Sequence, residues 1–227
     1  GDGLLMARPA GRGVAYDRAN AYNAIGNMTQ KGDLTLSYPT SGPGVVQPHA
    51  VTSVVGGAGG TWTYTYDANG NMTSRTENGL AYTQVFNADN RLESVTVGGD
   101  TTEFVYDGNN ARVARIADGV TTYYVGGIYE TTGVTTTRYY MLGGQRVAMR
   151  VTNGVEDTLT YLHGDHLGST SLATDAAGGQ VSRVGYYPYG DTRYAVGETP
   201  TDFLYTGQRQ EAGIGLYDYV ARFYDPY

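Results

Sequence analysis

The chain has 227 residues, a formal net charge of −7 and no cysteine, and Lys31 is its only lysine. An acidic chain with scattered arginines lacks the basic surface that nucleic-acid binding needs, and the absence of cysteine excludes disulfides and thiolate metal sites. No apolar run approaches the roughly 18 residues of a membrane-spanning helix. We therefore expect no nucleic-acid partner and no transmembrane segment.

Glycine (34 residues) and tyrosine (22 residues) are unusually frequent. Glycine serves turns, and tyrosine serves half-buried strands. No apolar helical period is sustained for two turns, so we predict an all-β protein with essentially no helix. The first ten residues lack a methionine start, a charged region and an apolar stretch. We expect no signal peptide and a start inside a longer protein.

Residues 22–29 (YNAIGNMT) introduce a pattern that is clearest at 66–73 (YDANGNMT). Before the second copy, residues 61–66 alternate strictly, which places Trp62, Tyr64 and Tyr66 on one face of a strand and three threonines on the other. Asp67 can bond backbone two residues further on, and Gly70 tolerates a positive φ. The segment therefore predicts a tight hairpin.

Looser copies of this unit begin at Phe86 and Tyr106, so the tyrosine-position residues 22, 66, 86 and 106 are spaced by 44, 20 and 20. A degraded copy is expected in the first gap. Such a period indicates a repeat architecture in which each unit buries its apolar face against its neighbours.

Between the first two copies, residues 33–38 predict a short strand, and the glycine- and proline-rich residues 39–60 predict a long loop with a strand near 50–55. Beyond residue 61, strands and turns alternate at about ten-residue spacing. The further strands expected are 82–86, 92–97, 102–106, 113–116, 121–125, 136–142, 145–151, 158–162, 170–175 and 181–187. Past about residue 130 the strict repeat stops while the β pattern continues.

The repeats resemble the tyrosine-aspartate (YD) repeats of the RHS family. Four later segments resemble the RHS-repeat-associated core domain: 161–170 (YLHGDHLGST), 186–190, 203–211 and 215–226, the last of which contains Arg222 and Asp225. The resemblance implies YD repeats over 1–130 and a core over 131–227, continuous in one curved antiparallel sheet that forms part of a hollow shell. It also implies a bacterial protein, outside the cell or on its surface, whose shell encloses a toxic C-terminal segment.

His163, Asp165 and His166 lie within four residues and could contribute to a metal site. Residues i and i+3 of a strand point to opposite faces, however, and the chain has only one other histidine. We favour a structural role for all three residues, in a turn, and expect no metal and no cofactor.

Asp225-Pro226 is the second candidate. The resemblance implies release of the C-terminal segment by self-cleavage at paired aspartates, one of them in a second Asp-Pro motif, and two carboxylates that share a proton could activate water. This chain has no second Asp-Pro. We therefore expect no catalysis by these residues.

These observations predict a structural, non-enzymatic shell protein that encloses cargo or assembles with its own longer chain or with identical subunits. Two alternatives stay open. One is a carbohydrate-binding surface module, since exposed tyrosines can stack on sugars, and the other is the shell of a self-processing toxin carrier. Tyrosine ladders across strands explain the same residues more simply than a sugar site.

Overall fold

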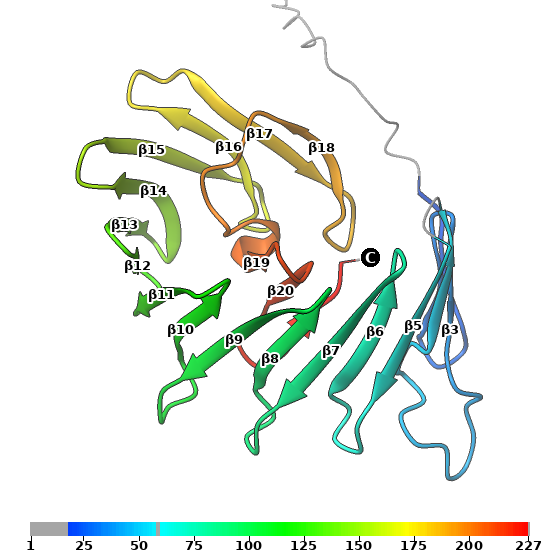
Figure 1. Ribbon diagram of the computed structural model, residues 1–227. Helices are drawn as coiled ribbons and strands as arrows, with labels where there is room; N and C mark the ends of the chain where they lie inside the picture. Colours follow the sequence, from blue (N-terminus) through cyan, green and yellow to red (C-terminus); the bar gives the residue numbers. More distant parts are fainter. Residues whose placement is uncertain (1–17, 58–59, 227) are drawn as a thin grey trace, which may run out of the picture.

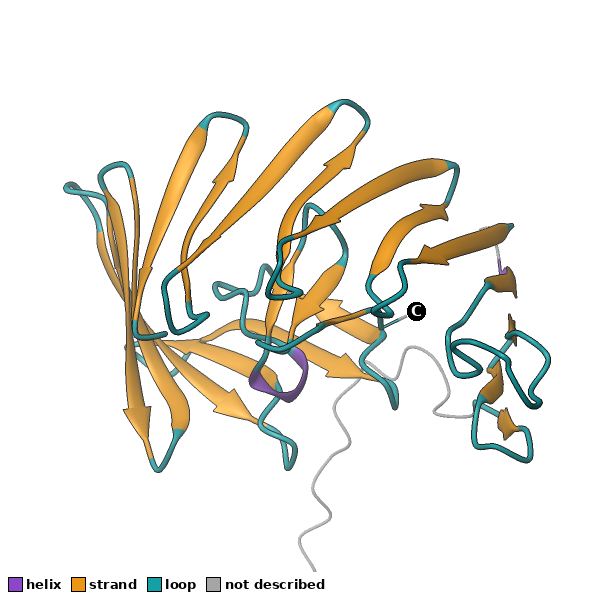
Figure 2. Cartoon of the chain, turned by 90° about the horizontal axis from the view of Figure 1, so that it is seen from below, coloured by secondary structure: helices purple, strands orange, loops and turns teal. Residues whose placement is uncertain are grey.

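The computed structural model describes residues 18–57 and 60–226 and confirms the predicted all-β fold (Figure 1). An 18-stranded sheet is an antiparallel meander in which each strand pairs with the strands before and after it in the chain. The sheet is strongly curved, so one face points inward (Figure 2). No helix within these residues could cross a membrane.

The strands follow one another with short turns. The first half of the sheet contains β1 (Asn20–Tyr22), β2 (Met28–Lys31), β3 (Leu34–Ser37), β4 (Ser53–Gly56), β5 (Thr61–Tyr66), β6 (Met72–Glu77), β7 (Leu80–Phe86), β8 (Leu92–Val97) and β9 (Asp100–Tyr106). The second half contains β10 (Arg112–Ala117), β11 (Val120–Val125), β12 (Tyr129–Thr132), β13 (Thr135–Leu142), β14 (Gln145–Thr152), β15 (Asp157–Gly164), β16 (Thr170–Asp175), β17 (Gln180–Tyr186) and β18 (Thr192–Val196).

Alternation decides which side chains face inward. In β5, Trp62 and Tyr64 are buried while the threonines between them are exposed, as the sequence predicts. The two-residue turns at one edge of the sheet also follow the prediction. Both central residues have positive φ at Asn78-Gly79, Gly98-Gly99 and Asp118-Gly119, which is the type I′ geometry that suits the twist of a hairpin.

The C-terminal segment, residues 201–226, lies inside the curve of the sheet (Figure 1). It forms a 3₁₀ turn, η2 (Tyr205–Gly207), and a small antiparallel sheet of β19 (Arg209–Glu211), β20 (Leu216–Asp218) and β21 (Phe223–Tyr224). Ile214 and Leu216 pack with Leu92, Val95 and Phe104 of the 18-stranded sheet, which is called the wall below. The segment therefore fills part of the interior with apolar side chains.

The wall has two further core clusters. Leu34, Val54, Trp62 and Tyr64 form one on β3 to β5. Phe203 of the C-terminal segment packs against the other, on β13 to β16, with its ring perpendicular to that of Tyr139. The inner face of the wall is thus buried in three patches, and the C-terminal segment covers two of them.

Within residues 18–57 and 60–226 the sheet is not closed by backbone hydrogen bonds, since β1 and β18 each pair on one side only. The two ends are connected through side chains instead. Asp191, in the turn between β17 and β18, is buried and forms ion pairs with Arg18 and with Lys31 of β2. The Arg18 guanidinium also lies 4.3 Å from the ring centroid of Tyr187.

Candidate functional site: the turns and the enclosed C-terminal segment

The predicted turn at Asp67 is built around its carboxylate. Oδ1 accepts hydrogen bonds from the backbone N–H groups of Asn69 and Asn71, both at 2.9 Å, and Oδ2 accepts one from the Asn71 amide at 2.9 Å. These bonds, led by the Asn71 side chain, lower the pKa of Asp67. Gly70 has φ +85°, which is the positive φ that the sequence predicts at this position of the turn.

In the part of the chain that the structure describes, six turns have the same pair of bonds, in which the first side chain accepts from the N–H groups two and four residues further on. The residues that accept them are Asn23, Asp67, Asn87, Asp107, Asp165 and Asp175. The last two lie beyond residue 130, where the strict sequence repeat stops. The geometry of the turn continues there, although glycine and threonine replace the tyrosine before Asp165 and Asp175.

The segment that contains His163, Asp165 and His166 forms this same turn, and Asp165 is its acceptor. Asp165 accepts bonds from Leu167 and Ser169, both at 2.9 Å, as Asp67 does in its own turn. His163 is exposed and lies 3.1 Å from the hydroxyl of Thr174, and His166 is exposed in the turn. Within the described part of the chain, no group of three His, Cys, Asp or Glu side chains is placed to hold a metal ion.

Two of the repeat tyrosines, Tyr66 and Tyr106, donate hydrogen bonds to backbone carbonyls, and Tyr186 does the same in the second half of the sheet. The hydroxyl of Tyr106 donates to the carbonyl of Leu92, the first residue of β8, at 2.9 Å, and that of Tyr186 donates to Thr170, the first residue of β16, at 3.0 Å. Tyr66 makes the equivalent bond to Val51 at 2.8 Å. Burial raises the pKa of Tyr66 and of Tyr106 to about 12. These hydroxyls are therefore structural donors between neighbouring strands.

The degraded copy expected between residues 22 and 66 corresponds to Tyr38. Its hydroxyl donates to the carbonyl of Met28, the first residue of β2, at 2.9 Å. The turn that follows has been enlarged into the loop between β3 and β4, which is why the aspartate and glycine of the repeat are not recognisable there.

Ion pairs attach the C-terminal segment to the wall. Arg112 of β10 lies 2.6 Å from Glu211 and 3.4 Å from Asp218, and Arg115 lies 3.2 Å from Glu211. The side chains of Arg112 and Glu211 are only 8% and 5% exposed. Because this pair is withdrawn from water, the loss of one partner would leave a buried charge without compensation.

Other basic side chains bind backbone carbonyls of the segment. Arg75 of β6, which is fully buried, donates to Ile214, and Arg91 donates to Val220. Lys31 donates to the carbonyl of Pro226. In the opposite direction, Arg209 of the segment pairs with Glu130 of β12. These contacts could not be predicted from local patterns, because the partners are 79 to 195 residues apart in the chain.

Asp225 lies at the end of this segment. Its carboxylate is 3.5 Å from the Tyr64 hydroxyl, at the edge of a cavity of about 240 Å³ that Tyr66, Met72 and Lys31 also line. Burial and the Asp225 charge raise the pKa of Glu77. Sequence reasoning missed Glu77, which lies on β6 and has no motif around it. Arg222 is exposed in the turn between β20 and β21, where its carbonyl accepts a hydrogen bond from the Tyr219 N–H at 2.9 Å.

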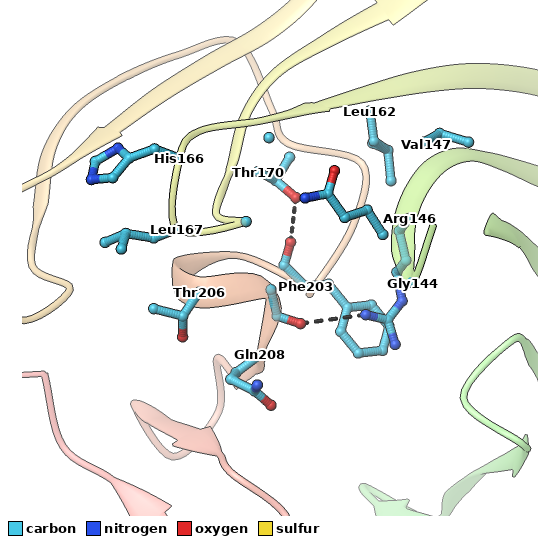
Figure 3. A pocket seen from close by; sticks show the side chains of 14 residues that line it. Gly144, Arg146, Val147, Leu162, His166, Leu167, Thr170, Phe203, Thr206 and Gln208 are labelled. Atoms are coloured by element: carbon cyan, nitrogen blue, oxygen red, sulfur yellow. Dashed lines mark hydrogen bonds between the residues drawn. The ribbon is translucent and has the colours of Figure 1, made fainter. Parts of the chain in front are cut away.

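A larger cavity, of about 420 Å³, lies between the turn preceding β14, the turn between β15 and β16, and η2 (Figure 3). Arg146 and Phe203 line one side of it, and His166 and Leu167 line the other. Thr170 and Phe203 both line the cavity, and the Thr170 hydroxyl donates a hydrogen bond to the Phe203 carbonyl at 2.6 Å, which joins the wall to the segment. The remaining lining contains three polar side chains (Gln145, Thr206 and Gln208), two apolar side chains (Val147 and Leu162) and four glycines.

Residues 49–80, which contain β4, β5, the Asp67 turn and β6, match the family model described as RHS Repeat.

Among curated proteins, the tRNA3(Ser)-specific nuclease WapA of Bacillus spizizenii is 26% identical over 216 residues, and the tRNA nuclease WapA of Bacillus subtilis strain 168 is equally similar. The match covers 91% of this chain and 8% of each relative. Toxin subunit YenC1 of Yersinia entomophaga is 32% identical over 81 residues, or 34% of this chain and 8% of YenC1.

Solved structures share the fold. The crystal structure of TcdB2-TccC3-TEV superposes with a TM-score of 0.56 at 18% identity and covers 92% of this chain and 15% of that chain. The structure of TcdB2-TccC3 gives a TM-score of 0.54 at 17% identity, over 91% and 15% of the two chains.

The relatives correct one prediction. The expectation of a non-enzymatic protein is wrong, because several similar proteins are named as tRNA nucleases. That expectation rested on the absence of a recognisable catalytic motif in 227 residues, and the chain spans only 8% of the length of these relatives. A segment of this size carries too little of such a protein to decide the activity of the whole.

Proposed function

Because the chain belongs to the RHS/YD-repeat family, we propose that it forms part of the wall of a hollow β-shell in a bacterial toxin, and that this shell encloses a toxic segment. The observation that carries the proposal is the position of residues 201–226, which lie inside the curved sheet and are bonded to side chains of its inner face. A wall that already encloses its own segment is suited to enclosing cargo.

We place the division between YD repeats and RHS core near residue 130, as the motifs predict. In this assignment the core supplies both the last wall strands and the enclosed segment. The similarity to toxin subunit YenC1 and to WapA supports a protein that is secreted or exposed on the cell surface.

Limited proteolysis tests the enclosure. In the native chain, a broad-specificity protease should cut first near Val155, which is 95% exposed in a turn, and much later within 201–226. The double variant Arg112→Glu, Arg115→Glu should expose 201–226 to early cleavage because it repels Glu211 and Asp218. Arg150→Glu, at an exposed pair on β14, is the matched control. Equal cleavage rates at both places in the native chain would overturn the proposal.

The activity of the whole toxin is a second part of the proposal. The similarity to WapA supports cleavage of tRNA by the complete gene product. Incubation of that product with total tRNA, followed by gel electrophoresis and mapping of the cut ends, tests this directly. Intact tRNA after treatment with protein whose enclosed segment has been released would contradict the nuclease assignment and leave the shell assignment standing.

The open ends of the sheet support larger-chain or identical-subunit partners, since unpaired strand edges are places where further strands add. We expect β1 and β18 to continue into more wall or to contact another copy. Light scattering and negative-stain microscopy of the 227-residue chain should show oligomers or open tubes. A monodisperse monomer whose two end strands are protected from hydrogen exchange would contradict this part.

A further inference from the structure

The 420 Å³ cavity beside η2 contains a cation that no acidic side chain neutralises. Arg146, the second residue of β14, lies against the Phe203 ring with its guanidinium carbon 3.3 Å from the ring centroid. Its terminal nitrogens donate only to the carbonyls of Gly207 and Gly127, each at 3.3 Å. Among the described ion pairs none includes Arg146.

In this arrangement one N–H group of the Arg146 guanidinium makes no hydrogen bond to the described residues. Its Nε–H is buried and has no acceptor among the described residues. Burial lowers the pKa of Arg146. The Tyr139 hydroxyl and the Glu130 carboxylate oppose this effect, and Glu130 is already paired with Arg209. Buried polar groups are nearly always hydrogen-bonded, so an exception requires an explanation.

Neutral polar side chains complete the cavity. The amides of Gln145 and Gln208 and the imidazole of His166 line it, and in the described part of the chain these three groups make no side-chain hydrogen bond. A cavity of this size lies within the range of small-ligand sites. Its lining offers one fixed positive charge, several unused donors and no carboxylate.

We propose that this cavity binds a carboxylate, either of a small organic acid or of a glutamate or aspartate side chain in a peptide. Stacking on Phe203 fixes the plane of the guanidinium, and a planar guanidinium matches a carboxylate through two parallel hydrogen bonds. The charge also matches, since one carboxylate balances one arginine, whereas a phosphate monoester brings an additional fraction of a charge. The site does not depend on the proposed shell function.

Nuclear magnetic resonance of the ¹⁵N-labelled 227-residue chain tests the proposal. The probes are sodium glutarate, the blocked tripeptides Ala-Glu-Ala and Ala-Gln-Ala, sodium phosphate and sodium chloride, all at one ionic strength. Glutarate, the glutamate peptide or both should shift the amide signals of Gly144, Gly168 and Gly207 in a saturable way. Binding of glutarate alone would indicate a free acid, and tighter binding of the glutamate peptide than of the glutamine peptide would indicate a protein ligand.

Variants connect the signal to the cavity. Arg146→Gln should weaken binding at least tenfold, and Arg150→Gln, on the same strand but exposed and paired with Asp157, should leave it unchanged. If Arg146→Gln fails to fold, Gln208→Leu keeps the arginine and should still weaken binding severalfold. Equal shifts with chloride, tighter binding of phosphate than of carboxylates, or unchanged binding in Arg146→Gln or in Gln208→Leu would each overturn the proposal.

Discussion

At the scale of single residues, the fold depends on one turn used many times. The acceptor at its first position can be aspartate or asparagine, because Asn23 and Asn87 make the same two backbone bonds as Asp67. The residue three positions later needs a positive φ, which Gly70 meets as glycine and Asn90 meets as asparagine. Both are residue types that adopt this conformation readily.

Replacing Gly70 by valine should destabilise the protein by about 1–2 kcal/mol, the cost of a side chain in the left-handed region. A Cβ there would meet no close neighbour, so strain in φ is the cause and not a clash. Gly108 occupies the second position of the equivalent turn at Tyr106, has no positive φ, and is the matched control. Urea unfolding should show a loss for Gly70→Val and none for Gly108→Ala. Equal midpoints for Gly70→Val and the parent would refute the turn assignment.

The Asp67 carboxylate should make stability depend on pH in acid. Its pKa is lower in the folded chain than its ordinary value of 3.8, so its contribution is complete above that value and is lost as the pH falls through the folded pKa. Asp67→Asn should therefore reduce the loss of stability below pH 3.8 and remain folded at pH 7. Asp89→Asn, which removes a carboxylate that accepts no hydrogen bond among the described residues, is the control. Parallel acid unfolding curves for both variants would argue against this role of Asp67.

At the scale of elements, tyrosine hydroxyls connect the end of a strand to the start of the strand before it, from β9 to β8 and from β17 to β16. The sequence predicts the rings in these positions but not the bonds of their hydroxyls, because the acceptor is a backbone carbonyl and carries no residue signature. The spacing of the tyrosines can therefore be predicted from the sequence, whereas the hydrogen bonds that their hydroxyls make are visible only in the structure.

Tyr106→Phe should cost about 1 kcal/mol, the net value of a typical internal hydrogen bond whose acceptor then lacks a partner. Tyr123→Phe is the control, since Tyr123 is 56% exposed and makes no side-chain hydrogen bond within the described residues. Thermal or urea unfolding of the two variants should differ by that amount. Identical stabilities would mean that water replaces the hydroxyl at Leu92 without loss.

Strand positions could be predicted closely because the alternation and the turn residues are local. The expected strand 92–97 coincides with β8, and 170–175 coincides with β16. The prediction missed β12 and β18, which are short and lack clear alternation, and also β1 and the three strands of the C-terminal segment, each of which has only two or three residues. Of the candidate site, the turn role of Asp165 was predictable. The partners of Glu211 and Asp225 were not, because they depend on how far the sheet curves.

At the scale of the whole molecule, the wall and the enclosed segment form one buried electrostatic unit. Arg112→Ala should destabilise the protein by about 3–5 kcal/mol, since it leaves Glu211 buried with only Arg115 beside it. Arg150→Ala removes an arginine from a pair whose side chains are 46% and 51% exposed and should cost less than about 1 kcal/mol.

Hydrogen exchange distinguishes the cause of that loss. Amides of β19 to β21 should exchange much faster in Arg112→Ala than in the parent, while those of β5 to β7 should change little. Uniform acceleration across the chain would indicate general unfolding and not release of the segment. Slow exchange of β19 to β21 in the variant would show that apolar packing alone holds the segment.

The single lysine of the chain, Lys31, takes part in two contacts, one between the ends of the sheet and one with the end of the C-terminal segment. Lys31 bonds Asp191, which joins the ends of the sheet, and also the carbonyl of Pro226, the last described residue of the enclosed segment. Its ammonium group is almost fully buried, so it cannot exchange either partner for water without moving. A movement that separates Asp191 from Lys31 would therefore also disturb the hydrogen bond at the end of the C-terminal segment. The same buried ammonium group couples the position of the segment to the position of the two sheet ends.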